Sequence, residues 1–571
     1  MPTVTIDGQE ITVEPGTSIV QAAKQLAVDV PVFCYHPGLS VPANCRMCLV
    51  DVEKAPKPLP GCYTECRDGM VIHTKSEKAQ DAQRSVLEFI LLNHPVDCPI
   101  CDQAGECVLQ EHYVTHSAQP SRLFHQKVAK PKAVPLGPRV VLDSERCILC
   151  TRCIRFCDEV AGRNELILED RGETVEINTF PGRQLENPYS LNTVDICPVG
   201  ALTDRKFRFQ RRVWFLERHD SVCSGCARGC SMRLDSYQDK TERVVPRYNP
   251  DVNNHWMCDE GRDLMVERTR QPGVDAMLRG EVTDDFDALL ALVASWLRPV
   301  EAEEALEADT LDEGEDEPGP GRVVFALSAS LTNEEVFAWA KLAEAIQARV
   351  VLTRRTAWQG DDVLKVADRD CNDTGAQAIL HVVRPKFGGP ETLSEALDHA
   401  EVLLAVDHDA AFSQEALEAI GKVDKTVVLT DIQSELAGAA SVVIPMPQLH
   451  QRDGTITNSK GWVQRTGAPL RAPPPNKAVA PLAAAIGLAG RLGVDIGLQP
   501  SDGAVDVMTA LATQVSAFHD MSHAYVGDLG AELTRGGPRT EKPARVEGTP
   551  EWEPDRVHPT HDRHYAIQRG N

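Results

Sequence analysis

Three cysteines and a histidine stand close together in the stretch NHPVDCPICDQAGEC, residues 93–107. Their spacing, H-x3-C-x2-C-x5-C, puts four side chains that bind transition metals on one short segment. A histidine beside cysteines can equally be a packed or capping residue, so this stretch alone leaves the role of the histidine open. The candidate ligands are His94, Cys98, Cys101 and Cys107.

A second group has the spacing C-x10-C-x2-C-x13-C near the N-terminus. Plant-type ferredoxins hold a [2Fe–2S] cluster with a C-x4-C-x2-C loop and a distant fourth cysteine, because two irons need two thiolates each. The first gap is longer here, but the same arrangement is predicted. Cys66, four residues beyond Cys62, is an alternative fourth ligand. The predicted [2Fe–2S] ligands are Cys34, Cys45, Cys48 and Cys62.

Two further groups each combine three near cysteines with a remote one. The stretch CILCTRCIRFC and a distant Cys-Pro pair follow the pattern of bacterial ferredoxins, in which three thiolates and a remote fourth hold a [4Fe–4S] cluster. The last group, C-x2-C-x3-C-x27-C, again combines three near cysteines with a remote one and predicts another [4Fe–4S] cluster. The ligands are Cys147, Cys150, Cys153 and Cys197 for one, and Cys223, Cys226, Cys230 and Cys258 for the other.

Zinc is the main alternative, because tetrahedral thiolate sites serve both metals. Zinc sites usually pair two C-x2-C knuckles, whereas a triplet with a remote cysteine suits a larger cluster. One [2Fe–2S] and three [4Fe–4S] clusters, with four ligands each, use all but three of the 18 cysteines and also need His94. The cysteines left out are Cys66, Cys157 and Cys371; we interpret Cys157, which Asp158 follows, as a buried thiol.

The elements that must position these residues are short. Residues 3–13 alternate around an Asp-Gly pair and predict a β-hairpin, and TSIVQAAKQLAV predicts a helix capped by its first threonine. A hairpin, a helix and a cysteine loop suit a small β-grasp module. Residues 80–93 read as a helix that leads directly into the histidine segment, and 137–270 as short elements and loops.

After residue 272 cysteine nearly vanishes, and β-rich runs alternate with helical pattern. A T-x-x-E capping box opens a predicted helix at 332–347. The alternation predicts a doubly wound α/β domain with a parallel sheet. The acidic run 301–321 and the C-terminal tail are expected to be disordered. The predicted strands are 322–327, 349–353, 401–406 and 426–429.

Six parts are therefore expected. The predicted fold class of the first half is α+β, with a ferredoxin-like β-grasp and iron–sulfur modules. An α/β doubly wound domain is predicted to follow it. The parts are a [2Fe–2S] β-grasp domain at 1–78, a His/Cys3 [4Fe–4S] domain at 79–118, a [4Fe–4S] ferredoxin-like domain at 137–215, a further [4Fe–4S] domain at 216–272, the α/β domain at 273–534 and a tail at 535–571.

The net charge and the composition of the chain limit the classes of function that it can have. The formal net charge of −25 argues against a nucleic-acid binder. The basic and aromatic stretch 204–218 is better explained as a cover over anionic clusters, a subunit contact or a solvated amphipathic segment. The first residues lack the pattern of a signal peptide, and no apolar run is long enough to cross a bilayer, so we expect reduced cysteines in the cytoplasm.

The motifs FCYHPGLSVPANCRMC, NHPVDCPICDQAGEC, CILCTRCIRFC, DICPVGALTD and CSGCARGC…CDEGR follow one another over residues 1 to about 265. In this order they resemble the large iron–sulfur subunit, of the 75 kDa or G type, of respiratory NADH:quinone oxidoreductase (complex I). The resemblance implies that His94 is a true ligand and that Cys62 completes the [2Fe–2S] site. It also implies that the fourth quartet, present only in some bacterial members, lies off the main electron path.

The second half resembles a degenerate, shortened molybdopterin-oxidoreductase fold, notably in RDGTITNSKGWVQ at 452–464. Catalytic relatives usually place a cysteine or selenocysteine on molybdenum downstream of the fourth quartet, and here no cysteine occurs between Cys258 and Cys371. We therefore expect neither molybdenum nor pterin.

The resemblance implies an electron relay in an oxidoreductase that is a translocase. Electrons would pass from a flavin-bearing, NADH-oxidising subunit to quinone-reducing subunits of the peripheral arm, on the inner face of the plasma membrane. No G-x-G-x-x-G or P-loop motif precedes a helix, so no NADH or flavin site and no catalytic residue is expected on this chain. The alternatives are a diaphorase subunit of a soluble NAD-linked hydrogenase, a formate-dehydrogenase-type molybdenum enzyme and a zinc scaffold without redox activity.

Overall fold

The structure is a computed structural model in which two compact units form from interleaved parts of the chain. It describes residues 1–117, 120–271, 273–298, 322–383, 392–406, 412–467, 470–471 and 477–533. Within these, unit 1 comprises residues 1–216 and 254–259, and unit 2 comprises 217–253 and the residues from 260 onward. The predicted acidic insertion 301–321 and the tail 535–571 lie outside the described residues.

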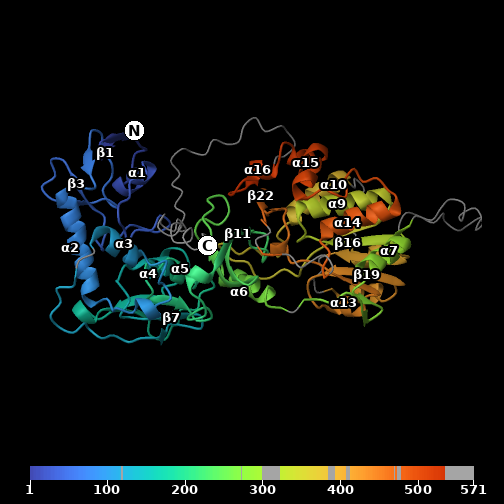
Figure 1. The fold of residues 1–571 in the computed structure, drawn as a ribbon, viewed down its shortest axis with the longest axis horizontal. Helices are drawn as coiled ribbons and strands as arrows, with labels where there is room; N and C mark the ends of the chain where they lie inside the picture. The colour runs from blue at the N-terminus through green and yellow to red at the C-terminus, as the bar shows by residue number, and fades with distance from the viewer. Residues whose placement is uncertain are drawn as a thin grey trace, which may run out of the picture. The chain divides into compact units, whose positions relative to one another are not determined.

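Unit 1 begins with a five-stranded sheet in the order β2-β1-β5-β3-β4; Figure 1 labels its strands β1 and β3. The predicted hairpin is confirmed: β1 and β2 pair antiparallel through Asp7 and Gly8, whose φ angles of 47° and 84° suit the tight turn. β1 also pairs in parallel with β5, which closes the β-grasp. The elements are β1 Thr3–Ile6, β2 Gln9–Thr12, α1 Ile19–Gln25, β3 Leu49–Val52, β4 Leu59–Pro60 and β5 Val71–His73.

Helix α1 packs its apolar face, including Ile19 and Ala22, into the core of this sheet. The prediction that Thr17 caps the helix is wrong, because the cap is the next residue, Ser18. The Ser18 hydroxyl accepts a hydrogen bond from the Gln21 backbone, and the Gln21 side chain accepts one from the Ser18 backbone. This reciprocal pair satisfies two amides that the first turn leaves open.

Helix α2 (Glu77–Asn93) extends from the sheet to the histidine segment and starts three residues before the predicted helix. Ser76 caps its start, and His94 is its C-terminal cap residue. Buried Gln83 donates to the Leu49 carbonyl on β3, which fixes the helix on the sheet. A 3₁₀ turn at Cys98–Ile100 and α3 (Val108–His116) follow.

The rest of unit 1 consists of short elements, as predicted. Two small sheets, β10-β7-β6 and β8-β9, flank the loop with the C-x2-C-x2-C motif. Residues 254–259, which we name the strap, return from unit 2 to pack here: Trp256 stacks on His36 and Phe156 at centroid distances of 5.3 and 4.9 Å. The elements are β6 Val134–Pro135, β7 Val140–Leu142, α4 Arg152–Glu159, β8 Leu166–Glu169, a 3₁₀ turn Gly172–Thr174, β9 Glu176–Thr179, α5 Asn192–Asp195, β10 Leu202–Asp204 and a 3₁₀ turn Val213–Phe215.

Unit 2 opens with an antiparallel three-stranded sheet, β11-β12-β13, whose first connection carries three cysteines. A separate small sheet has the order β21-β22-β23, in which β22 pairs antiparallel with both neighbours. The elements are β11 Glu217–Val222, β12 Ser231–Tyr237, β13 Lys240–Pro246, α6 Asp259–Arg268, a 3₁₀ turn Leu449–Gln451, β21 Thr455–Thr457, β22 Trp462–Arg465, a 3₁₀ turn Ser516–Phe518, α16 His523–Val526 and β23 Ala531–Glu532.

The main sheet of unit 2 has seven strands in the order β15-β14-β20-β19-β18-β16-β17, and its last five are parallel. All four predicted strands and the predicted helix are present. The elements are β14 Met277–Leu278, β15 Glu281–Val282, α7 Phe286–Leu297, β16 Val323–Ser328, α9 Asn333–Ala345, β17 Arg349–Thr353, α10 Asp373–Val383, α11 Leu393–Ala396, β18 Val402–Val406, α12 Gln414–Ile420, β19 Lys425–Thr430, α13 Glu435–Ala439, β20 Val442–Pro445, α14 Pro481–Leu492 and α15 Ala504–Gln514.

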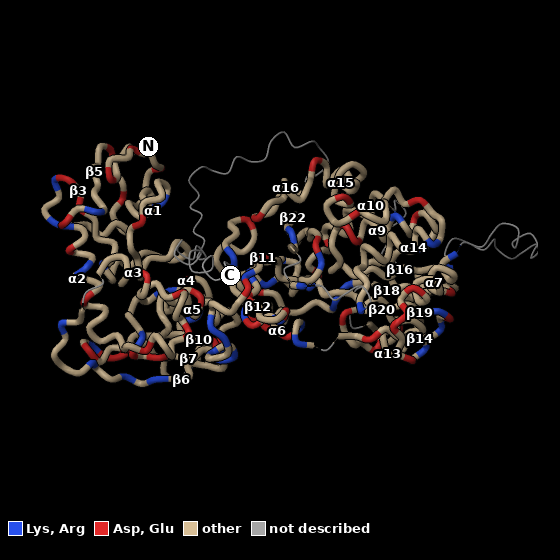
Figure 2. Tube along the Cα trace, in the orientation of Figure 1, with Lys and Arg blue, Asp and Glu red and all other residues tan. Residues whose placement is uncertain are grey.

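Helices cover both faces of this sheet (Figure 1). On β16, Phe325 packs with α9 and α14, whereas its neighbour Ala326 packs on the opposite face with α11 and α12. This alternation explains why the strand is apolar without a break. Charged residues of both signs are interspersed along the trace of each unit (Figure 2). Within the described ranges, no helix combines the length and the apolar character needed to span a bilayer.

Candidate iron–sulfur sites

The four predicted [2Fe–2S] ligands, named set 1, meet in the loops beside β3 and β4. The Cys34 backbone amide donates to the Cys45 sulfur at 3.4 Å, and the Cys62 amide donates to the Cys48 sulfur at 3.5 Å. Contact with Cys45 and Cys62 lowers the pKa of the Cys34 thiol, and contact with Cys34 raises the pKa of Cys45. The pKa shifts of the two thiols have opposite directions because their side chains are close enough to share a proton.

Cys66, the alternative fourth ligand, lies apart from this contact. Its thiol is buried in the β-grasp core, and burial alone raises its pKa, whereas the pKa values of Cys62 and Cys48 respond to each other. The geometry brings Cys62 rather than Cys66 to the other three thiols. Ligation itself stays a prediction.

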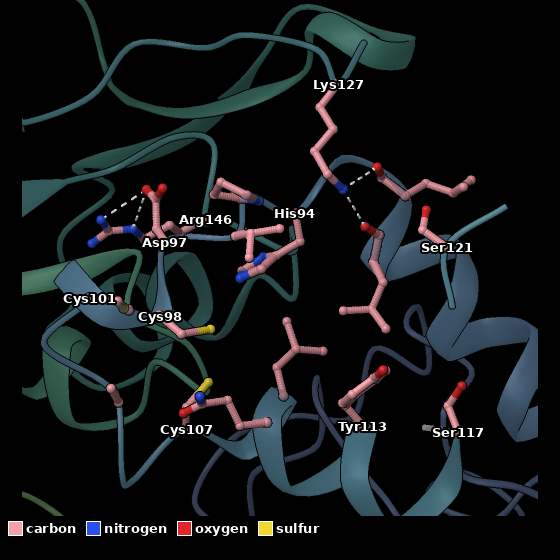
Figure 3. Close-up of a pocket in the computed structure, with 18 of the residues that line it drawn as sticks. His94, Asp97, Cys98, Cys101, Cys107, Tyr113, Ser117, Ser121, Lys127 and Arg146 are labelled. Carbon is pink, nitrogen blue, oxygen red and sulfur yellow. Dashed lines mark hydrogen bonds and ion pairs between the residues drawn. The ribbon is translucent and has the colours of Figure 1, made fainter. Parts of the chain in front are cut away.

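The histidine group, named set 2, lines a cavity of about 480 Å³ in unit 1. In Figure 3 the imidazole of His94 and the sulfurs of Cys98 and Cys107 point into this cavity. Its walls include Leu91, Leu109 and other apolar residues from α2 and α3. Helix α2 places the histidine at its end, and the 3₁₀ turn at Cys98–Ile100 places the first two cysteines. The cavity is therefore built from the predicted segment and its two flanking helices.

Two features of set 2 fit a soft-metal cluster. The Nδ1 atom of His94 is buried and has no hydrogen-bond partner in the part of the chain that the structure describes. Burial, followed by the charges of Lys127 and Arg146, lowers the pKa of His94 to about 4, so the ring is neutral and can offer a lone pair. Burial raises the pKa of Cys107 to about 12, a cost that bonding of its thiolate to a metal would offset.

Cations hold the segment that carries set 2. Lys127 donates to the carbonyls of Leu91 and Leu92 at 3.0 and 2.7 Å and so caps the end of α2. Arg146 donates to Asp97, the residue before Cys98, at 3.0 Å (Figure 3). These contacts fix the backbone on both sides of His94 and keep positive charge near the thiols.

The C-x2-C-x2-C group, named set 3, gathers around one enclosed apolar pocket. Its four cysteines line this pocket together with side chains such as Leu142, Ile177 and Val199. The backbone passes twice through the left-handed region, at Leu149 with φ 54° and Thr151 with φ 62°. Such strain persists where the surroundings fix it, and it is typical of binding loops. The cysteines are Cys147, Cys150, Cys153 and Cys197.

Amide groups surround the remote ligand of set 3. Burial raises the pKa of Cys197, while the backbone amides of Val199, Leu202 and Ala201 donate toward its sulfur and oppose that shift. Hydrogen bonds to sulfur are one means by which proteins tune cluster potentials. Cys157 does not line the pocket; its thiol lies near Asn187 and Glu165 instead.

The last group, named set 4, is divided between the units. Cys223, Cys226 and Cys230 are buried in the turn between β11 and β12, where the Cys223 amide donates to the Cys230 carbonyl at 2.9 Å. Cys258 is buried in the strap, which belongs to unit 1. The approach of Cys258 to the other three thiols therefore stays a prediction.

Sequence reasoning missed what supports this turn inside unit 2. Arg355 donates to the Ser224 carbonyl at 2.8 Å, and Gln464 donates to the Gly229 carbonyl at 2.8 Å. Asn458 donates to the Arg228 carbonyl at 3.0 Å. Two of these residues, Asn458 and Gln464, lie in RDGTITNSKGWVQ, so this stretch supports the cysteine turn. The sequence contains no local signal for these contacts, because the partners are far apart along the chain.

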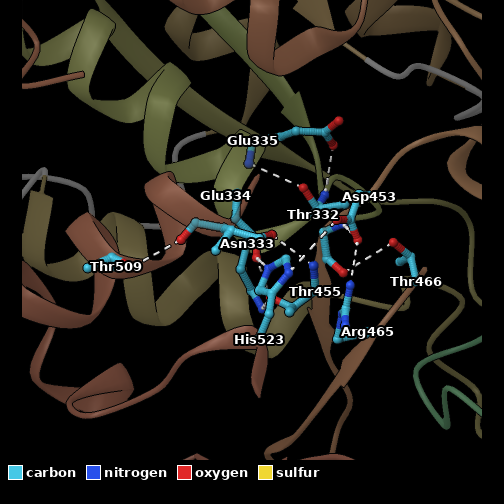
Figure 4. Close-up of polar contacts among 12 residues, drawn as sticks. Thr332, Asn333, Glu334, Glu335, Asp453, Thr455, Arg465, Thr466, Thr509 and His523 are labelled. Atoms are coloured by element: carbon cyan, nitrogen blue, oxygen red, sulfur yellow. Dashed lines mark hydrogen bonds and ion pairs between the residues drawn. The ribbon is translucent and has the colours of Figure 1, made fainter. Parts of the chain in front are cut away.

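A buried polar network at the start of α9 was also not predicted (Figure 4). The Glu334 carboxylate accepts from the Thr455 amide at 2.8 Å and lies 2.9 Å from the His523 ring. Glu335 pairs with Arg452 at 2.7 Å. All lie in unit 2 and join β21 to the helix. Each of these carboxylates has partners, and we therefore interpret the network as a structural junction.

Among the described residues, no three His, Cys, Asp or Glu side chains are arranged to hold a single metal ion. Thiolate-rich donor sets around a cavity, with one histidine, match the ligands of iron–sulfur clusters, which carry one electron at a time. The arrangement can therefore hold redox centres in a protein interior.

Family models match four stretches of the chain. These are a 2Fe-2S iron-sulfur cluster binding domain at 1–77, the NADH-ubiquinone oxidoreductase-G iron-sulfur binding region at 83–122, the NADH-quinone oxidoreductase subunit 3 ferredoxin-like domain at 137–203 and the molybdopterin oxidoreductase Fe4S4 domain at 216–267. Each of the four ligand groups predicted from spacing falls in one of these matches.

Curated relatives agree with these matches. The chain is 44% identical over 262 residues to the G subunit of NADH-quinone oxidoreductase from Streptomyces coelicolor, covering 46% of this chain and 31% of the relative. It is 39% identical over 346 residues to the G subunit from Mycobacterium tuberculosis, covering 60% and 41%. The potato mitochondrial NADH dehydrogenase [ubiquinone] iron-sulfur protein 1 is 41% identical over 306 residues, covering 53% and 41%. The chain spans less than half the length of each of these relatives.

Among solved structures, an NAD+-reducing [NiFe]-hydrogenase matches 37% of this chain and 91% of its own chain, with 27% identity and a TM-score of 0.34. A score of this size supports no conclusion about function.

Proposed function

We propose that this chain is the electron-relay subunit of an NADH-quinone oxidoreductase, because four stretches within residues 1–267 match iron–sulfur family models and the matched relatives are G subunits of that enzyme. It would accept electrons from a flavin-bearing, NADH-oxidising partner and pass them toward quinone-reducing subunits of complex I. The observation that carries the proposal is the gathering of the predicted ligands in unit 1 into three groups, sets 1 to 3.

Set 1 would hold a [2Fe–2S] cluster, and sets 2, 3 and 4 would each hold a [4Fe–4S] cluster. When bound, such clusters supply reversible one-electron oxidation and reduction at potentials set by their ligands and surroundings. The neutral His94 ring gives set 2 one ligand fewer with negative charge than an all-thiolate set. Set 2 is thus expected to differ in potential from set 3.

The chain itself positions the ligands and keeps water away from most of them. The amides aimed at Cys197 and the apolar wall of set 3 both favour a dry, hydrogen-bonded thiolate. Lys127 and Arg146 place positive charge beside set 2, where it stabilises thiolate ligands. The protein's contribution is therefore electrostatic and geometric, with no proton transfer required of a side chain.

We further propose that unit 2 from residue 273 onward is a degenerate, shortened form of the molybdopterin-oxidoreductase fold, without molybdenum or pterin. Its parallel sheet with helices on both faces supports the α/β part of this proposal. The carboxylates of the polar junction at the start of α9 are already paired with protein groups. Attachment to the membrane would come only through other subunits of the complex.

The test is metal analysis of the full chain, purified or reconstituted without oxygen. Four loaded sets predict about 14 irons with equal acid-labile sulfide and no molybdenum. Cys153→Ser should lower the iron content by about four, because it removes one corner ligand of set 3. Cys157→Ser is the matched control on the same helix, α4, and should keep the full iron content.

Zinc in place of iron, with no sulfide, would overturn the redox function. About 10 irons in the wild-type chain would leave one [4Fe–4S] set without a cluster, and variants in each set would identify it.

A further inference from the structure

Arg152 links two of the ligand sets. It stands between Cys150 and Cys153 in the sequence, and its side chain is 7% exposed. One terminal nitrogen donates to the Ile196 carbonyl at 3.1 Å, next to Cys197 of set 3. The other donates to the Tyr35 carbonyl at 2.5 Å, next to Cys34 of set 1. A single guanidinium therefore touches the backbone beside a ligand of each set.

The charge of this guanidinium has no carboxylate partner among the described residues. Its remaining nitrogen, Nε, is buried and has no hydrogen-bond partner in the described part of the chain. The cysteines whose thiolate forms would interact with its charge are Cys150, Cys197 and Cys34, which again belong to sets 3 and 1. No Asp or Glu is among them.

A buried guanidinium is costly in this situation. Arginine cannot lose its proton in a protein, and an unpaired charge away from water is strongly unfavourable. Two carbonyl dipoles offset only part of that cost. The missing negative charge is available on both sides if sets 1 and 3 carry thiolate-bound clusters, which are anions.

We propose that Arg152 is a shared counter-charge for sets 1 and 3, and that it raises the reduction potentials of the clusters in both sets together. The proposal rests on the proposed function, because it needs clusters in these two sets. An added electron makes a cluster more negative, so a fixed positive charge in a low-dielectric interior favours the reduced form. Arg152 is a positioning and tuning residue and takes no part in bond making.

The neighbouring Arg155 gives a matched comparison. It donates to the Cys34 carbonyl at 2.6 Å and to the Ser40 carbonyl, so it holds the same loop of set 1. Its side chain is half-buried, and water and salt screen its charge more strongly. Removal of Arg155 tests the loop contact, whereas removal of Arg152 tests the contact together with the buried charge.

The experiment is a redox titration of the full, reconstituted chain, followed by electron paramagnetic resonance of each reduced cluster. Arg152→Gln is expected to lower the equilibrium constant for one-electron reduction at least tenfold at both sets, a fall of about 59 mV or more in each midpoint. Arg152→Lys keeps the charge and should retain most of both potentials. Arg155→Gln should shift both by less than Arg152→Gln.

Unchanged potentials in Arg152→Gln, or a shift at only one set, would overturn the proposal. So would a Lys variant that shifts as far as the Gln variant, since the contact geometry would then matter more than the charge. If Arg152→Gln holds no clusters, Arg152→Lys decides: wild-type-like potentials support the counter-charge, and lost clusters refute it. Absence of iron and sulfide from the wild type is a separate result that refutes the proposed function instead.

Discussion

Gly200 shows how closely the backbone approaches set 2. A Cβ atom at this position would stand 2.1 Å from the sulfur of Cys101 and 3.1 Å from the Cβ of Gln103. Only glycine leaves room for this thiol.

We therefore predict that Gly200→Ala displaces Cys101 and removes the set 2 cluster. Iron content should fall by about four per chain, with the signals of the other clusters kept. Gly487→Ala is the control, because nothing lies within 4 Å of its added Cβ and alanine favours the interior of α14. Full iron content in Gly200→Ala would show that Cys101 can move without loss of ligation.

His450 couples the stability of unit 2 to pH. Its ring lies between the Ser221 hydroxyl at 3.2 Å and the Met265 sulfur at 2.8 Å, and burial lowers its pKa to about 3. In the unfolded chain histidine titrates near 6.5. The unfolded state therefore binds a proton below about pH 6.5 while the folded state stays neutral, so stability is complete above that pH and is lost as pH falls toward 3.

The expected slope from this one group is at most about 1.4 kcal/mol per pH unit within that window. His450→Gln, which has no titrating ring, should remove this part of the acid sensitivity in urea unfolding measured from pH 7 to 4. Parallel pH profiles of the variant and the wild type would refute the assignment to His450.

At the scale of elements, α9 shows what a sequence motif reveals and what it conceals. The T-x-x-E pattern predicted the capping box, and Thr332 and Glu335 form it (Figure 4). The same Glu335 carboxylate also pairs with Arg452, which lies 117 residues farther along the chain. A local sequence pattern can predict a helix cap, because the two capping residues are three positions apart. It cannot predict a partner that is distant in the sequence and that only folding brings near.

We predict that Thr332→Ala lowers the unfolding free energy by about 1 kcal/mol, the usual effect of losing a cap. Glu335→Ala should cost about 3–5 kcal/mol, because it also takes a carboxylate from buried Arg452. Urea unfolding followed by tryptophan fluorescence measures both. Thr392→Ala removes the same type of cap from the exposed start of α11 and serves as the control. Equal losses at Glu335 and Thr332 would show that the Arg452 pair contributes nothing.

For the ligand sets, too, the sequence predicted some features and missed others. Spacing predicted the cysteines that the structure gathers in sets 1 to 3, although it left Cys62 and Cys66 as alternatives in set 1, and ligation itself stays a prediction. It could not identify Arg152, Gly200 or the brace from Asn458 and Gln464, since each acts across 40 residues or more of chain or through the space it leaves empty. The chemistry of the site was thus readable from sequence, and its supporting surroundings were not.

At the scale of the molecule, the two units are stabilised by different means. The core of unit 2 is a large cluster of aliphatic and aromatic residues on the main sheet. The β-grasp core of unit 1 is much smaller and includes Cys48, Cys62 and Cys66 among its members. Loops that wrap around ligand sets depend on the bound group for much of their order.

Removal of iron with a chelator should therefore loosen unit 1 and spare the main sheet of unit 2. Hydrogen exchange measured by mass spectrometry is expected to quicken in 34–62, 94–107 and 147–157 and to stay slow in β16 and β18. The main sheet is the internal control within each sample. Equal protection of unit 1 with and without iron would show that its loops are ordered by the protein alone.

The strap has a consequence for how the chain is made. Trp256 stacks on His36 and Phe156, the Met257 amide donates to Asn192, and Asp259 accepts hydrogen bonds from Ser190 and Leu191. These contacts close unit 1 with residues that follow 37 positions of unit 2. During translation the first three ligand sets leave the ribosome before the strap that packs against them exists. Unit 1 therefore gains this part of its packing only after residues 217–253 of unit 2 have been synthesised.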